Sequence, residues 1–136
     1  MDIKEILSGA KVIAVVGLSP REERPSNVVA GYLKNAGSKI IPVNPGHKEI
    51  LGEKCYPSLE EIPEIYRRQI DIVDVFRRSE DTPQIVKDAA QHTSARVVWL
   101  QEGISSDEAA SLAHSYGLEI IMDRCILKEH RKLFGG

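Results

Sequence analysis

Five short apolar runs constrain the fold of this chain more than any other feature. They cover residues 11–17, 38–44, 70–76, 95–101 and 118–123, and each is rich in β-branched side chains. Runs that are apolar at consecutive positions are typical of strands buried on both faces, as in a parallel sheet covered by helices. Segments with helical spacing of apolar residues separate the runs. This alternation predicts an α/β fold with a doubly wound, mostly parallel sheet and helices on both faces.

The intervening segments carry recognisable helix signals. Apolar residues recur with helical spacing over residues 28–36, and Gly37 follows as a helix end. Short helices are expected at residues 2–8 and 126–134. Residues 51–63 predict a turn, a short strand near its middle and one helical turn.

Serines predict two further helix starts. Ser79 is expected to cap the helix that follows the third apolar run. Ser105, with Glu108 three residues later, fits a capping box for the next helix.

Length and composition bound the class of protein. The 136 residues fit one domain, residues 1–136, and 42% of them are apolar. No apolar stretch approaches the roughly 20 residues that span a bilayer, and residues 1–10 do not resemble a signal peptide. A formal net charge of −2 argues against a protein that coats nucleic acid. We therefore predict a cytoplasmic protein that binds neither membranes nor nucleic acid.

Motifs for metals and catalysis are missing. Cys55, Cys125 and the four histidines show no metal-ligand spacing, so no metal is predicted. The sequence contains no GxGxxG, GxxxxGK[ST], GxSxG or HExxH motif. No pairing of a nucleophile with a base is suggested by position. The sequence therefore predicts a binding protein without catalysis of its own.

The ends of the strands are the place to look for a ligand site. In open α/β sheets, ligands bind beyond the carboxyl ends of the strands, where the strand order reverses. The segments that follow the five runs, residues 17–27, 44–48, 76–79, 101–105 and 123–125, are therefore expected to share one edge of the sheet.

The first of these segments suits a phosphate. Gly17 permits a tight turn, Ser19 and Ser26 carry hydroxyl groups, and Arg21 and Arg24 carry positive charges. A helix is expected to begin directly after them, and helix N-termini attract anions. The alternative is a solvated loop in which arginines and glutamates pair with each other.

The second segment lacks the acid that NAD-binding sheets place there for the ribose. It holds Asn44 and Pro45, followed by His47 and Lys48. Two groups that can be cationic favour a ligand with a phosphate near its ribose. An ordinary Pro-Gly turn with exposed polar residues is the alternative.

The third segment follows an aromatic residue. Phe76 could stack on a purine while Arg77 and Arg78 hold its phosphates. Surface pairing of the arginines with Glu80 and Asp81 is the alternative.

Two further segments complete the edge. Gln101 can both donate and accept hydrogen bonds, as an amide-bearing ligand requires, and Cys125 is expected at the same edge. The Cys125 thiol is either reactive or packed and inert. Trp99 either reports binding at this edge or lies in the core, facing away from it.

Five stretches, taken in order, resemble one family. They are "AVVGLSPREERPSNVVAGYLKNAGSKIIPVNPG", "ILGEKCYPSLEEIP", "DIVDVFRRSED", "VVWLQEGI" and "MDRCILKEH". The chain resembles the small single-domain CoA-binding proteins, which are similar to the amino-terminal domain of the succinyl-CoA synthetase α subunit. The resemblance covers nearly the whole chain and implies a Rossmann-like fold that binds coenzyme A. The synthetase's domain with the phosphorylated histidine has no counterpart here, so ligase activity is not implied.

The resemblance also implies which residues meet CoA. The phosphates fall at the first segment, the adenine and 3′-phosphate at the second and third, and the pantetheine arm at the fourth, with Cys125 at the same edge. In that order the implied contacts are Gly17, Leu18, Ser19, Arg24 and Ser26; Asn44, Pro45, His47, Phe76 and Arg77; and Leu100, Gln101 and Glu102.

Two other functions stay open at this point. The first is an enzyme or sensor of the same fold that binds NAD(P) or another nucleotide. The second is a regulatory subunit whose CoA site controls a protein partner.

Overall fold

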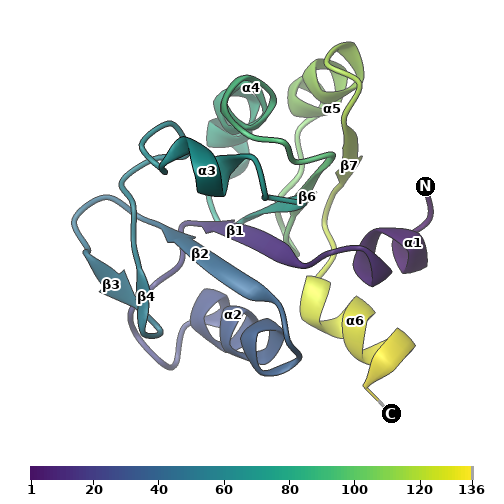
Figure 1. Cartoon of the computed structure of the whole chain (residues 1–136). Helices are drawn as coiled ribbons and strands as arrows, with labels where there is room; N and C mark the ends of the chain where they lie inside the picture. The colour runs from purple at the N-terminus through teal and green to yellow at the C-terminus, as the bar shows by residue number, and fades with distance from the viewer. Residues whose placement is uncertain (136) are drawn as a thin grey trace.

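A single parallel sheet organises the molecule, which a computed structural model describes over residues 1–135. The five parallel strands lie in the order β2-β1-β5-β6-β7 (Figure 1). Their bounds are β1 Val12–Val16, β2 Lys39–Val43, β5 Ile72–Val75, β6 Val97–Leu100 and β7 Glu119–Ile121. Each lies inside one of the five apolar runs. The predicted α/β fold is therefore confirmed, and it is Rossmann-like.

Helices cover both faces of this sheet. Figure 1 shows α2 and α6 on one side of the sheet and α4 and α5 on the other. The helix bounds are α1 Ile3–Ser8, α2 Pro25–Asn35, α3 Glu64–Arg67, α4 Thr82–His92, α5 Asp107–Ser115 and α6 Ile126–Phe134. None of the helices within residues 1–135 is long and apolar enough to cross a membrane.

The core consists of two apolar layers, one on each face. Successive residues of β1 point to opposite faces. Ala14 and Val16 belong to the layer that includes α4 and α5, whereas Ile13 and Val15 belong to the layer of α1, α2 and α6. Because both faces are buried, consecutive positions of the strands are apolar.

Segment 51–63 is more elaborate than predicted. It includes the second strand of a small hairpin, β3 Glu49–Ile50 and β4 Glu53–Lys54. The chain then runs along the outer edge of β2, where the Tyr56 N–H donates to the Pro42 carbonyl at 3.1 Å. The Asn44 N–H donates to the Tyr56 carbonyl at 2.9 Å. This segment therefore covers the C-terminal end of the β2 edge.

Both serine caps were predicted at the wrong residue. A 3₁₀ turn, η1 Ser79–Asp81, precedes α4, which starts only at Thr82. The Ser79 hydroxyl oxygen instead accepts from the Ser105 N–H at 3.1 Å. The cap of α5 is Ser106, whose hydroxyl accepts from the Ala109 N–H at 3.1 Å. The Ser105 N–H therefore links the loop that follows β6 to the loop that follows β5.

Candidate functional site

The strand order reverses between β1 and β5. The chain passes from β1 to β2 on one side and returns to β5 on the other side of β1. All five strands are parallel, so the predicted segments do meet at the carboxyl edge. The residues at the reversal are Gly17 after β1 and Phe76 after β5.

Gly17 is required where the two strands separate. Its φ of +87° lies in the left-handed region, which glycine adopts without strain. A Cβ atom at this position would lie 2.4 Å from the Phe76 carbonyl oxygen. Only glycine therefore allows the first loop to leave β1 this close to β5.

The loop after Gly17 is held by its own polar groups. The Ser26 hydroxyl accepts from the Ser19 N–H at 2.9 Å, and the Ser19 hydroxyl accepts from the Arg21 N–H at 3.1 Å. The Asn27 amide donates to the Ser19 carbonyl at 2.9 Å. The loop is thus folded before any ligand binds. The part played by Asn27 was not predicted, because an asparagine in the first turn of a helix gives no such signal.

This loop leads directly into the N-terminus of α2. Arg24 is the N-cap residue, and its side chain makes no capping hydrogen bond. Pro25 is the first helical residue, and it has no N–H to satisfy. Arg24 is exposed, while the neighbouring Arg21 pairs with Glu23 at 2.8 Å. A helix N-terminus next to an exposed arginine provides the predicted anion-binding geometry.

Asn44 joins the first two loops. Its side-chain amide donates to the Leu18 carbonyl at 2.8 Å, and its backbone carbonyl accepts from the Cys55 thiol at 3.4 Å. The side chain of Leu18 is fully buried, so only its backbone can meet a ligand. The turn that follows, residues 45–48, is exposed and carries His47 and Lys48 at its tip.

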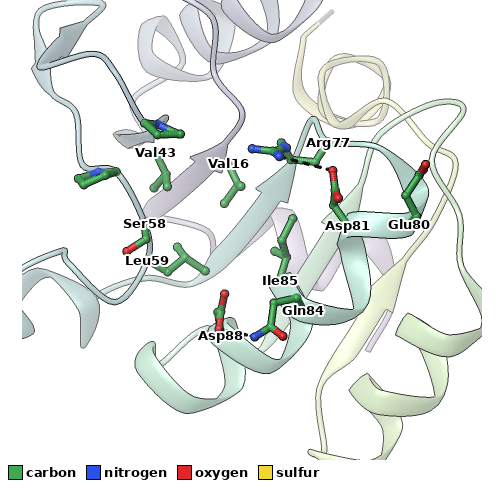
Figure 2. Close-up of a pocket in the computed structure, with 12 residues that line it drawn as sticks. Val16, Val43, Ser58, Leu59, Arg77, Glu80, Asp81, Gln84, Ile85 and Asp88 are labelled. Carbon is green, nitrogen blue, oxygen red and sulfur yellow. Dashed lines mark hydrogen bonds and ion pairs between the residues drawn. The ribbon is translucent and has the colours of Figure 1, made fainter.

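A first cavity lies between the β1 and β2 exits and α4. We call it the α4 cavity; its volume is about 330 Å³. Figure 2 shows Val16, Val43, Leu59 and Ile85 forming its apolar walls. Pro45, Arg77 and Asp81 are among the residues that complete it.

A second cavity, which we call the α2 cavity, opens on the opposite face of the sheet. Its volume is about 580 Å³. Two residues, Arg77 and Asp81, line both cavities. The other lining residues are Pro25, Val29, Phe76, Arg78, Gln101, Glu102, Ile104 and Cys125.

Gln101 is the buried polar group of the α2 cavity. Its side chain is only 4% exposed, and its Oε1 accepts from the Ile126 N–H at 3.1 Å. The amide therefore satisfies the first turn of α6, whose N-cap residue Cys125 makes no side-chain capping bond. The amide nitrogen of Gln101 is left as the group available to a ligand. Leu100, directly before it, is fully buried and can offer only backbone atoms.

Trp99 lies in the core, as one of the two interpretations held. Its side chain is fully buried, and its indole N–H donates to the Arg124 carbonyl at 2.8 Å. This bond fixes the loop that carries Cys125. Trp99 therefore stabilises a loop of the α2 cavity, although it does not line the cavity.

The two cysteines differ in access. Cys125 is partly exposed at the α2 cavity, whereas Cys55 is buried. Burial raises the pKa of the Cys55 thiol, and the bond to the Asn44 carbonyl offsets part of this. Only Cys125 is placed to meet a ligand.

Asp74 is a buried acid that the sequence analysis did not single out. It lies in β5 between Val15 and Trp99 of the neighbouring strands, and it is 0% exposed. Neither carboxyl oxygen has a hydrogen-bond partner among residues 1–135. Burial raises the pKa of this carboxyl well above its usual range.

Acids accompany most of the basic groups at this edge. Arg77 and Arg78 each lie 3.5 Å from Asp81, which is the surface pairing weighed as an alternative. Glu102 pairs with Lys128 at 3.1 Å. Within the described residues, no group of three His, Cys, Asp or Glu side chains could hold a metal ion.

Together these features define a Rossmann-like α/β domain whose carboxyl edge carries a preformed loop and two joined cavities. The model of the CoA binding domain family matches residues 11–131. This chain therefore belongs to the CoA binding domain family.

Relatives include both single domains and long enzymes. The chain is 46% identical to protein YneT of Bacillus subtilis, over 95% of this chain and 92% of YneT. It is 28% identical to the ADP-forming acetate–CoA ligase I of Archaeoglobus fulgidus, over 85% of this chain but only 18% of the ligase. A solved structure from Pyrococcus horikoshii superposes with a TM-score of 0.91 at 42% identity, over 98% of this chain and 91% of that one.

Proposed function

We propose that this chain binds CoA or an acyl-CoA across the carboxyl edge of its sheet. The observation that carries the proposal is that Arg77 stands between two cavities on opposite faces, beside the preformed loop at the N-terminus of α2. CoA has an adenosine end and an amide-bearing arm, joined by a pyrophosphate. A site with two cavities and an anion-binding junction matches this order of chemical groups.

The phosphates belong at the junction. The turn from Arg24 to Ser26 at the N-terminus of α2 would meet the pyrophosphate, with Gly17, Leu18 and Ser19 beside it. The N–H groups of Gly17 and Ser19 already donate within the chain, so these residues would shape the site. The adenosine end fits the α4 cavity, beside Pro45, with His47 and Lys48 near enough at the turn to attract the 3′-phosphate. These contacts explain why the chain has arginines and a lysine where an NAD site uses glycines and an acid.

The pantetheine arm belongs in the α2 cavity. Phe76 lines the α2 cavity and not the α4 cavity, so we assign it to the arm rather than to the adenine, where the resemblance had implied it. The Gln101 amide nitrogen can donate to an amide carbonyl of the arm, and Cys125 lies at the same cavity. Glu102 at the rim is exposed and paired with Lys128. The thiol or thioester end would therefore lie close to the start of α6.

Binding without catalysis is part of the proposal, as is a location in the cytoplasm. The match covers only 18% of the length of the Archaeoglobus fulgidus ligase, so the activity of the whole ligase is not part of the proposal. A protein partner that responds to the CoA site is compatible with this difference in length. A pull-down from lysate with and without CoA would identify such a partner.

Calorimetric titration with CoA, acetyl-CoA, dephospho-CoA, NAD and NADP tests the proposal. CoA should bind more tightly than either dinucleotide. Dephospho-CoA should bind about 10-fold more weakly than CoA, because a charge-assisted contact to the 3′-phosphate is lost. Tighter binding of NAD or NADP than of CoA would instead establish the alternative nucleotide-binding function.

A further inference from the structure

Most of the basic groups around the carboxyl edge pair with acids of the same chain, although Arg24 has no such partner within residues 1–135. Among these residues, Arg21 pairs with Glu23, Arg124 with Glu129 and Lys128 with Glu102. The basic side chain of each pair is exposed. A ligand can avoid them, because none of the basic partners lines a cavity.

Asp81 is different because it lies at the junction itself. One carboxylate oxygen, Oδ2, is 3.5 Å from Arg77 Nη2 and 3.5 Å from Arg78 Nε. The Asp81 side chain is 26% exposed, less than Arg77 at 42% or Arg78 at 75%. Figure 2 shows Asp81 and Arg77 facing one another across the end of the α4 cavity. Asp81 also lines the α2 cavity.

We infer that Asp81 is a built-in competitor for the phosphate groups of the ligand. The inference rests on the proposed function. A phosphate that approaches Arg77 must share its guanidinium with the Asp81 carboxylate, and the two anions repel each other at short range. The carboxylate therefore holds the affinity for anions below what the two arginines would otherwise support.

This competition favours long ligands over small anions. A free phosphate gains only the arginine contacts, so the Asp81 carboxylate offsets much of what it gains. A ligand that also fills both cavities gains further contacts that Asp81 does not oppose. Asp81 is thus a specificity-determining residue, which keeps the junction from being occupied by abundant small phosphates.

Asp81→Asn isolates this effect. Asparagine keeps the shape and removes the charge, and the Asp81 side chain makes no capping hydrogen bond to α4 that would be lost. Glu108→Gln is the matched control: Glu108 is an exposed acid in the first turn of α5, lines neither cavity and takes part in no ion pair within residues 1–135.

The experiment measures dissociation constants for CoA, pyrophosphate and uncharged pantetheine with the parent and both variants. Asp81→Asn should tighten CoA about two- to fivefold, as expected for an exposed ion pair. It should tighten pyrophosphate by a larger factor, because free pyrophosphate carries more negative charge at the junction than the diesterified pyrophosphate of CoA. It should leave pantetheine unchanged. Glu108→Gln should leave all three constants close to those of the parent.

The outcomes separate the inference from the proposed function. If the parent protein binds CoA but Asp81→Asn binds it equally or more weakly, Asp81 is no competitor and the inference is wrong. An equal gain in Glu108→Gln also overturns it, because the effect would then be one of general charge. If the parent protein does not bind CoA at all, the proposed function itself fails, and the inference falls with it.

Discussion

At the scale of single residues, two positions in adjacent strands set the conditions for the site. Gly17 allows β1 and β5 to separate, and Asp74 is a carboxyl enclosed in the sheet just before Phe76. Gly17 is required because a larger residue would contact the Phe76 carbonyl. Asp74 is unfavourable when ionised, because its carboxyl is buried. Each leads to a measurement that does not depend on the other.

Gly17→Ala should destabilise the protein and weaken CoA binding. The left-handed backbone alone costs a residue with a Cβ about 1–2 kcal/mol, and contact with the Phe76 carbonyl adds to this. Gly103→Ala is the control, since its φ is +82° and a Cβ would meet nothing within 4 Å. Urea unfolding should show a larger loss for Gly17→Ala, and calorimetry a loss of CoA affinity only there. Equal losses of stability would mean that the close approach to Phe76 is unimportant.

Asp74→Asn should stabilise the protein near neutral pH. The pKa of Asp74 is raised by burial in the folded state, so folding takes up a proton once the pH exceeds about 4, the pKa of an unfolded aspartate. The contribution of Asp74 to the free energy of unfolding should therefore be fully present below that pH and be lost as the pH rises through the folded pKa. Asparagine has no proton to take up, so the variant should show a flatter profile. Parallel profiles from pH 4 to 8 would contradict this.

At the scale of elements, the loop and α2 act as one unit. The hydrogen bonds among Ser19, Ser26 and Asn27 fix the loop onto the first turn of the helix. Arg24 is the exposed end of this unit and contributes no capping bond. Its charge is therefore available for binding and contributes little to folding.

Arg24→Ala should weaken CoA by about 10-fold or more, as expected for a lost charge-assisted hydrogen bond. The melting temperature should change little, because surface substitutions of this kind shift stability by about 0.5 kcal/mol or less. Arg21→Ala, which removes an arginine already paired with Glu23, is the control and should affect CoA less. A sharp drop in melting temperature with unchanged affinity would make Arg24 a structural residue.

At the scale of the whole molecule, the two thiols differ in access, and only Cys125 lines a cavity of the candidate site. Cys125 should react with iodoacetamide first, because it is partly exposed at the α2 cavity. Cys55 should react slowly, since it is buried and its thiol pKa is raised. Saturating CoA should slow only the reaction of Cys125. Intact mass measurements on Cys55→Ser and Cys125→Ser assign each adduct, and labelling of Cys125 at the same rate with CoA present would place the arm elsewhere.

The fold could be predicted from the sequence because all five parallel strands lie within short, mainly apolar runs. The meeting of the strand exits followed from parallel strands alone. Helix starts were harder to predict, since Ser105 and Ser106 both fit a cap and only packing decides between them. The pairing of Arg77 and Arg78 with Asp81 was one of the two interpretations, since these residues are close in the sequence. The cavities and the bond from Asn27 to Ser19 depend on how side chains from separate segments meet, which a local sequence pattern does not show.

The covered edge of β2 has a consequence for how this domain behaves among its copies. Exposed strand edges template the pairing of one chain with another, which leads to aggregation. Here Tyr56 occupies part of the β2 edge, and Pro42 has no N–H to offer a passing strand. The opposite edge, β7, is only three residues long and starts with the charged Glu119. Any lasting association of this domain must therefore be made by side-chain surfaces, and crowding alone should not drive it into fibres.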